Sequence, residues 1–118
     1  MNKRRVGGEK EHKVKSYMEE AGYTILEMNF RCRQGEVDII AKNEEYLVFV
    51  EVKYRSGSAN GFPEEAVDKK KQKRICRAAG YYMYIHNLNE YTPVRFDVAG
   101  VLGDHITYTE NAFLWQGV

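Results

Sequence analysis

The sequence predicts one α/β domain, an α+β sandwich in which two helices cover a mixed β-sheet. Apolar residues recur at helical spacing in two segments, and five other short segments are rich in Val, Ile, Phe or Tyr, as strands are. Short turns separate most of these strands. The expected order is therefore helix, three strands, helix and two strands, and 118 residues are enough for a single core.

The first predicted helix follows a basic arm. Residues 1 to 8 are polar and basic and end in two glycines, so we expect a flexible basic arm there and a single domain over residues 9 to 118. From about Glu9 to Ala21 the apolar residues recur three and four positions apart, which predicts an amphipathic helix. Gly22 is a typical helix stop.

Three strands are predicted next. They run from Tyr23 to about Phe30, from Val37 to Ala41 and from Tyr46 to Tyr54. Turn-forming residues separate them, Gln34-Gly35 in the first gap and Asn43-Glu44 in the second. Successive strands with short turns favour an antiparallel meander.

The second half of the chain repeats this alternation. Residues 56 to 61 form a polar loop with two glycines, and Pro63 suits the first turn of a helix that should run to about His86. Two further strands are expected, from Val94 to Leu102 and from about Ile106 to Thr109. Gly103-Asp104 between them suits a tight hairpin.

Composition narrows the class of protein. No apolar stretch approaches the roughly 20 residues needed to span a bilayer, and the basic start is not followed by a hydrophobic signal segment. We therefore expect a cytoplasmic protein that does not associate with membranes. Cys32 and Cys76 are far apart and lack metal-site spacing, which favours reduced thiols over a disulfide or a zinc site. Three scattered histidines do not favour a histidine-centred hydrolase.

Basic residues gather on the second helix although the formal net charge is only +1. Such a local patch can hold a phosphate backbone, and the alternative is an ordinary solvated helix face. The patch consists of Lys69, Lys70, Lys71, Lys73, Arg74 and Arg77.

Charged residues also occur where core residues are expected. Glu51 and Lys53 are two positions apart on an apolar strand, so both side chains should project to one side, and Asp38 interrupts the strand before it. By helical phase, Glu11 and Lys71 lie on the apolar faces of their helices. The structural alternatives are an ion pair for Glu51 and Lys53, a turn cap for Asp38, a dipole-favoured acid for Glu11 and a Lys71 ammonium that reaches water. Buried charges need a partner or a metal, and several that converge suggest a functional site.

Metal-assisted phosphodiester cleavage would account for this pattern. Mg²⁺ binds hard oxygen ligands and often takes one or two carboxylates, which Asp38 and Glu51 could supply, with the Val52 carbonyl as a third ligand. A bound metal lowers the pKa of a water and stabilises charge on the phosphate. Lys53 could orient that water or neutralise the developing oxyanion.

At these residues the sequence resembles the PD-(D/E)xK nuclease superfamily. More narrowly, it resembles the YraN-like family of bacterial endonuclease-like proteins, which are related to Holliday junction resolvases. The resemblance covers about residues 8 to 112, nearly the whole chain. The matching segments are Gly22-Tyr23, Asn29, residues 35–41 (GEVDIIA), residues 48–55 (VFVEVKYR), residues 61–67 (GFPEEAV), Lys71-Gln72 and residues 95–98 (RFDV).

The resemblance implies a restriction-endonuclease-like αβββαβ core and a Mg²⁺ or Mn²⁺ cofactor. It implies metal ligation by Glu11, Asp38 and Glu51, with Lys53 as the catalytic lysine. Lys10 and Val14 depart from the family pattern, so Glu9 is the alternative acid of the first helix. The residues expected to bind nucleic acid are Arg55, Lys69, Lys70, Lys71, Gln72, Lys73 and Arg74.

The leading hypothesis is a Mg²⁺-dependent endonuclease acting on DNA, including structured or branched DNA, and working as a homodimer if it cuts two strands symmetrically. The alternative is a nucleic-acid-binding protein on the same fold without catalysis. A scaffold role for the Tyr81-Tyr82-Met83-Tyr84 cluster is the third hypothesis, although most of that cluster is expected to pack in the core. The acid and lysine set, Asp38, Glu51 and Lys53, separates the first hypothesis from the second.

Overall fold

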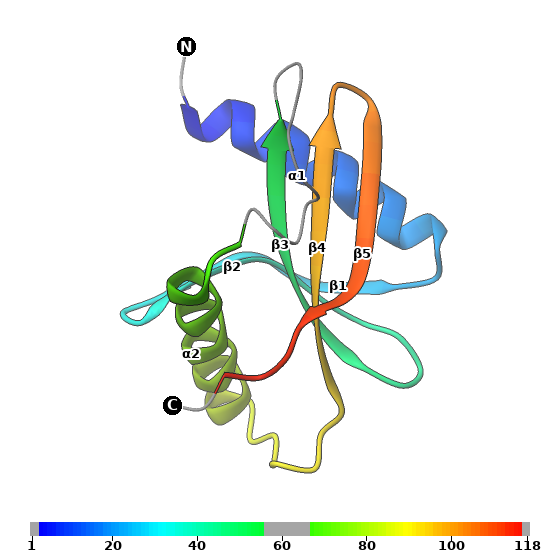
Figure 1. The fold of residues 1–118 in the computed structure, drawn as a ribbon. Coiled ribbons are helices and arrows are strands. Elements are labelled where there is room, and N and C mark those ends of the chain that lie inside the picture. The colour runs from blue at the N-terminus through cyan, green and yellow to red at the C-terminus, as the bar shows by residue number, and fades with distance from the viewer. Residues whose placement is uncertain (1–2, 56–66, 117–118) are drawn as a thin grey trace.

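The fold is a five-stranded mixed sheet with one helix on each face (Figure 1), as the computed structural model of residues 3–55 and 67–116 shows. The predicted loop at residues 56 to 61 and the predicted helix start at Pro63 lie outside the described residues. Within the described ranges, no helix is long and apolar enough to cross a membrane. The elements are α1 (Lys3–Glu20), β1 (Thr24–Cys32), β2 (Gly35–Lys42), β3 (Leu47–Arg55), α2 (Lys69–Ile85), β4 (Val94–Leu102) and β5 (His105–Phe113).

Helix α1 begins at Lys3, earlier than the expected start at about Glu9, so residues 3 to 8 continue the helix instead of forming an arm. Its end follows the prediction. The Gly22 N–H donates to the Glu19 carbonyl and the Tyr23 N–H donates to the Met18 carbonyl, with Gly22 at φ +99°. This pair of bonds is a Schellman motif, in which a left-handed glycine satisfies the last carbonyls of a helix.

The five strands are hydrogen-bonded in chain order, β1-β2-β3-β4-β5. The first three strands form the predicted antiparallel meander, β4 lies parallel to β3, and β5 returns antiparallel to β4. A parallel neighbour needs a crossover connection, and the chain segment that contains α2 provides it. Strand β5 is longer than expected and extends to Phe113.

Strand β2 leaves β3 part-way along its length. The β2–β3 ladder pairs Ile39 with Val50 and continues to Lys42 and Leu47, whereas β3 continues beside β4 as far as Arg55. Asp38 and Glu51 are the first residues beyond the end of the β2–β3 ladder. The sheet therefore opens at these two acids.

Along β2, the face of the sheet toward which the side chains point changes at Asp38. Val37 packs in the cluster that contains α2 residues, whereas Ile39 packs in the cluster that contains α1 residues. Regular alternation predicts one face for both, so that expectation is wrong. The paired strand β1 is irregular at the same level, where Asn29 between Met28 and Phe30 has a left-handed φ of 54°.

Helix α2 begins at Lys69, with Asp68 as its N-cap. The Asp68 carboxylate accepts a hydrogen bond of 2.8 Å from the Lys71 N–H, which satisfies one of the free donors of the first turn. The expectation of one helix running from Pro63 is therefore wrong for Val67 and Asp68. The helix ends at Ile85, close to the predicted end.

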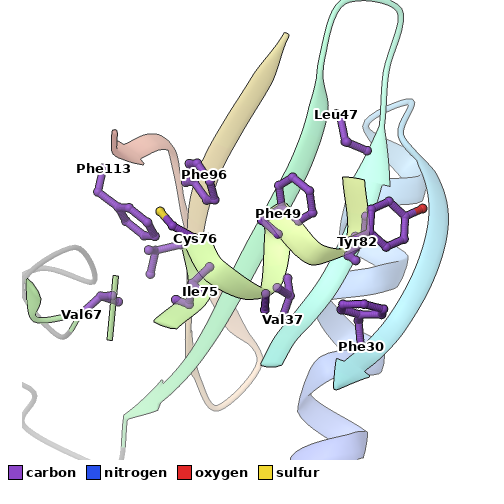
Figure 2. Close-up of a cluster of buried hydrophobic side chains, with 14 residues drawn as sticks. Phe30, Val37, Leu47, Phe49, Val67, Ile75, Cys76, Tyr82, Phe96 and Phe113 are labelled. Atoms are coloured by element: carbon purple, nitrogen blue, oxygen red, sulfur yellow. The ribbon is translucent and has the colours of Figure 1, made fainter. Parts of the chain in front are cut away.

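Two apolar cores hold the helices on the sheet. Figure 2 shows the core on the α2 side. There the Phe49 and Phe96 rings stack with their centroids 5.6 Å apart, and the Tyr82 ring meets the Phe49 ring edge-on. The core on the α1 side contains Val14 and Met18 of the helix against Val48, Val50, Val52, Ala99 and Val101 of the central strands.

A buried ionic network anchors the β4–β5 hairpin to the rest of the sheet. Asp97 is fully buried and accepts hydrogen bonds from the Arg95 guanidinium (2.8 Å), the Tyr108 hydroxyl (2.6 Å) and the Asn111 N–H (2.9 Å). The Arg95 guanidinium also donates to the hydroxyl of Tyr23, which follows α1. This network explains how an Arg and an Asp are tolerated in the core.

Candidate active site

Asp38 lies where β2 separates from β3, and its carboxylate takes the place of the missing ladder bond. Oδ2 of Asp38 accepts a 2.8 Å hydrogen bond from the Val52 N–H. A carboxylate that bonds a backbone N–H of the neighbouring strand is held in a fixed orientation. Val52 itself points its side chain into the α1-side core.

Glu51 lies next to Asp38 and is the most crowded acid of the site. Its side chain is buried, forms a hydrogen bond with the Asp38 carboxyl group, and is contacted by two lysines. Oε2 of Glu51 is 3.4 Å from Nζ of Lys71 and 3.8 Å from Nζ of Lys53. Strand β3 presents Glu51 and Lys53 to the same side, as the two-residue spacing predicts.

The two acids of this pair hold protons more tightly than ordinary carboxylates. Burial raises the pKa of Glu51 to about 8, the negative charge of Asp38 adds to this effect, and Lys71 and Lys53 oppose it. Burial also raises the pKa of Asp38, while the Val52 N–H and the hydrogen bond from Glu51 oppose the rise. The two carboxyl groups therefore titrate as a coupled pair, and both pKa values are raised by burial.

Glu11 reaches this pair from α1. It is buried, its pKa is raised to about 7 by burial and then by the charge of Asp38, and a hydrogen bond from Asn29 opposes the rise. Glu9, the alternative acid, is exposed. The structure thus brings Glu11 to Asp38 and leaves Glu9 in solvent.

The acids predicted to bind a metal include one pair of adjacent carboxyl groups, those of Asp38 and Glu51. Among the described residues, no group of three or more His, Cys, Asp or Glu side chains is placed to hold a metal ion together. The Asp38–Glu51 pair nevertheless fits Mg²⁺, because this ion takes one or two carboxylates and keeps water in its remaining positions. Half-buried Asp38 and buried Glu51, in contact with each other, form an oxygen-rich site, and a bound cation would lower their raised pKa values.

Comparison with known proteins identifies the family of this chain. A family model described as "Uncharacterised protein family UPF0102" matches residues 10–101, which include Glu11, Asp38, Glu51 and Lys53. The chain belongs to the UPF0102 family.

Three relatives cover nearly the whole UPF0102 chain. A UPF0102 protein of Lachnoclostridium phytofermentans is 50% identical over 113 residues, spanning 96% of each chain. One of Clostridioides difficile is 45% identical over 115 residues, covering 96% of this chain and 100% of the relative. One of Persephonella marina is 39% identical over 107 residues and covers 91% of each.

The residues predicted to bind nucleic acid separate into four groups in this UPF0102 chain. Lys71 turns toward Glu51, so it belongs to the acid site. The Gln72 amide donates to the Val67 carbonyl at 2.9 Å and accepts from Gln116 at 3.2 Å, so it ties the start of α2 to the C-terminal segment instead of facing solvent. The side chain of Arg55 lies outside the described residues. The exposed members are Lys69, Lys70, Lys73 and Arg74.

Sequence reasoning assigned no role to three residues near the site. Asn29 was noted only as part of the family resemblance. In the structure it forms a hydrogen bond with Glu11 and has a left-handed φ, a conformation that Asn tolerates better than most residues. Arg31 near the end of β1 and Arg33 in the β1–β2 turn line a recess beside α2. Their place at a turn is the signal in the sequence that could have marked them, because residues at turns lie on the surface by default.

Proposed function

We propose that this protein is a Mg²⁺-dependent endonuclease-like enzyme that hydrolyses phosphodiester bonds of DNA, with structured or branched DNA among its substrates. The observation that supports it best is the Asp38–Glu51 pair, a half-buried and a buried acid in contact at the opening of the sheet, with two lysines beside Glu51. A structural ion pair would need only one acid and one lysine.

In the proposed reaction a bound Mg²⁺ would supply an activated water and stabilise charge on the phosphate. Asp38 and Glu51 would hold the ion, with the Val52 carbonyl as the further expected ligand. The Val52 N–H keeps the Asp38 carboxylate oriented for this role. Glu11 contacts Asp38 and would position it through their hydrogen bond.

The two lysines would have different tasks. Lys53 projects beside Glu51 and is partly exposed, so its ammonium can reach a phosphate oxygen or the attacking water. Lys71 is closer to Glu51 at 3.4 Å and favours the ionised form of that carboxylate. Cutting two strands symmetrically would require a two-fold homodimer.

A cleavage assay tests this proposal. Purified protein is incubated with labelled duplex, single-stranded and four-way-junction DNA, with Mg²⁺ or Mn²⁺, beside Lys53→Ala. Lys42→Ala is the matched control, because Lys42 is an exposed lysine of the β2–β3 turn region outside the site. We expect Lys53→Ala to lower the cleavage rate by about 100-fold or more, as loss of a charge-stabilising group does, and Lys42→Ala to leave it unchanged.

Two results would count against catalysis. Cleavage that persists in Lys53→Ala would reject the mechanism. Tight DNA binding without cleavage by either metal would favour the alternative, a nucleic-acid-binding protein without catalysis. The lack of a three-residue ligand group among the described residues is the observation that favours this alternative.

A further inference from the structure

Two adjoining recesses lie between α2 and the β1–β2 turn, next to the acid site. The first has a volume of about 260 Å³ and is lined by Arg31, Cys32, Arg33, Gly35, Glu36, Lys71, Arg74 and Ile75. The second, of about 410 Å³, is lined by Arg33, Gln34, Lys70, Lys73, Arg74 and Arg77. Arg33 and Arg74 line both, so the two recesses form one surface, which we call the basic groove.

We propose that the basic groove binds the phosphodiester backbone of the strand that is cut, on one side of the scissile phosphate. This inference rests on the proposed function and adds to it a second set of contacts, which includes Arg31 and Arg33 of the β1–β2 turn. The groove has two walls, one from the turn and one from α2, whereas the basic helix alone would be an open surface.

The basic groove is strongly positively charged. In the part of the chain that the structure describes, seven basic side chains line it and Glu36 is the one acid, although the whole chain has a net charge of +1. Glu36 is partly neutralised by Arg31, whose Nε lies 3.1 Å from Oε2 of Glu36. Such a concentration of like charge inside a recess attracts a polyanion.

The basic groove is continuous with the acid site. Lys71 lines the first recess and its Nζ is 3.4 Å from Oε2 of Glu51. A strand whose phosphate lies at Asp38 and Glu51 would therefore place a neighbouring phosphate in the recess beside Lys71. The groove is an extension of the site and not a separate surface.

The lining chemistry indicates which part of a nucleic acid is bound. Among the described residues that line the groove, none is aromatic, so the groove lacks the stacking platforms that proteins use for unpaired bases. Arginine is the residue best suited to phosphate, because its planar guanidinium can bond two oxygens at once. Backbone contacts of this kind set position without reading sequence.

The walls of the groove are held at a fixed separation. A Cβ at Gly35 would lie 2.9 Å from the Arg74 carbonyl oxygen, so the hairpin and α2 are already in close contact there. The groove is therefore built before any ligand arrives, which reduces the ordering cost of binding.

A binding experiment without metal tests the groove separately from catalysis. Fluorescence anisotropy with labelled duplex and single-stranded DNA is measured in EDTA over a series of salt concentrations for the wild type, Arg33→Ala, Arg74→Ala and the double variant. We expect each single variant to weaken binding by roughly tenfold at low salt and to reduce the slope of log affinity against log salt by about one. Lys42→Ala is the control for a lost surface charge outside the groove.

Glu36→Gln gives a prediction of opposite sign. It removes the acid of the groove and releases Arg31 from its ion pair, so affinity should rise while the shape of the side chain is kept. Thermal unfolding of every variant checks that the fold is retained.

The outcomes distinguish the groove from the proposed function. Affinities and salt slopes of Arg33→Ala and Arg74→Ala equal to those of Lys42→Ala would overturn the groove, even if cleavage depends on Lys53. Weakened binding by these variants would support the groove, even if no DNA is cleaved. The groove proposal would also be overturned if the wild-type protein bound anionic lipid vesicles but neither duplex nor single-stranded DNA.

Discussion

Glu11, Asp38 and Glu51 form a short chain of acids in which Asp38 meets the other two, and this crowding is the main chemical feature of the molecule. Burial is the largest cause of all three raised pKa values, and repulsion from a neighbouring carboxylate adds to each of them. Such a site opposes folding when all its members are ionised, unless a cation is bound. Local rules of stability are commonly broken at functional sites in this way.

Glu11 gives a pH prediction for the metal-free protein. Its folded pKa of about 7 exceeds the ordinary 4.5, so the folded state holds the proton more tightly, and stability falls as the pH rises from about 4.5 through 7. Glu11→Gln removes this loss. In EDTA we expect the variant and the wild type to have similar free energies of unfolding at pH 4, and the variant to be more stable by about 1 to 3 kcal/mol at pH 8.

Urea unfolding at both pH values measures this difference. Glu9→Gln is the matched control, because Glu9 lies on the same helix but is exposed, and it should show no such pH-dependent gain. A Glu11→Gln effect of equal size at pH 4 and pH 8 would contradict the raised pKa.

At the scale of elements, alanine at Gly35 of β2 and at Gly80 of α2 is expected to have opposite effects on stability. Gly35→Ala places a Cβ 2.9 Å from the Arg74 carbonyl oxygen, a backbone atom that cannot move independently of α2. We expect a loss of roughly 1 to 3 kcal/mol in the free energy of unfolding. Gly80→Ala lies within α2 with its nearest neighbour, Trp115, at 3.9 Å, so helix propensity should raise stability by up to about 1 kcal/mol.

Chemical denaturation of the two variants beside the wild type tests the pair. Both changes add one methyl group at a glycine, but Gly35 has a positive φ of 159° and a close backbone neighbour, whereas Gly80 lies in a helix with its nearest neighbour at 3.9 Å. A Gly35→Ala protein as stable as Gly80→Ala would show that the hairpin can move away from α2, and the fixed walls of the basic groove would then be wrong.

The elements themselves were largely predictable, and the errors have physical reasons. Strand β4 and the end of α1 were found from their apolar pattern and from Gly22, because these signals are local. The start of α1 was placed too late, since two glycines were read as a break although the flanking residues continue the helix. The start of α2 was placed too early, because Pro63 was taken to mark the first turn, whereas α2 has its N-cap at Asp68.

At the scale of the whole molecule, the Arg95–Asp97 pair joins β4, β5 and Tyr23 in the α1–β1 connection. Asp97→Ala leaves the buried Arg95 guanidinium without its main partner, and we expect the free energy of unfolding to fall by about 3 to 5 kcal/mol. Glu110→Ala removes the exposed acid 3.6 Å from the same guanidinium and should cost less than about 1 kcal/mol.

Equilibrium urea unfolding compares the two variants. Equal and small losses would mean that water reaches Arg95 and that the network does not hold the hairpin. The sequence showed this Arg and Asp only as part of the family resemblance, because a two-residue spacing on a strand does not reveal that Tyr23 and Tyr108 complete the set.

By itself, the sequence determined which segments are helices and strands, and which charged residues are out of place among apolar neighbours. Periodicity is local, so it placed Glu51 beside Lys53 and turned Glu11 and Lys71 inward. Only the tertiary structure decided that β2 leaves β3 at Asp38, that Glu11 and not Glu9 meets that acid, and that the β1–β2 turn closes a basic groove against α2. These features depend on register, on one left-handed Asn29 and on contacts between residues far apart in the chain, which a repeating pattern of apolar residues does not encode.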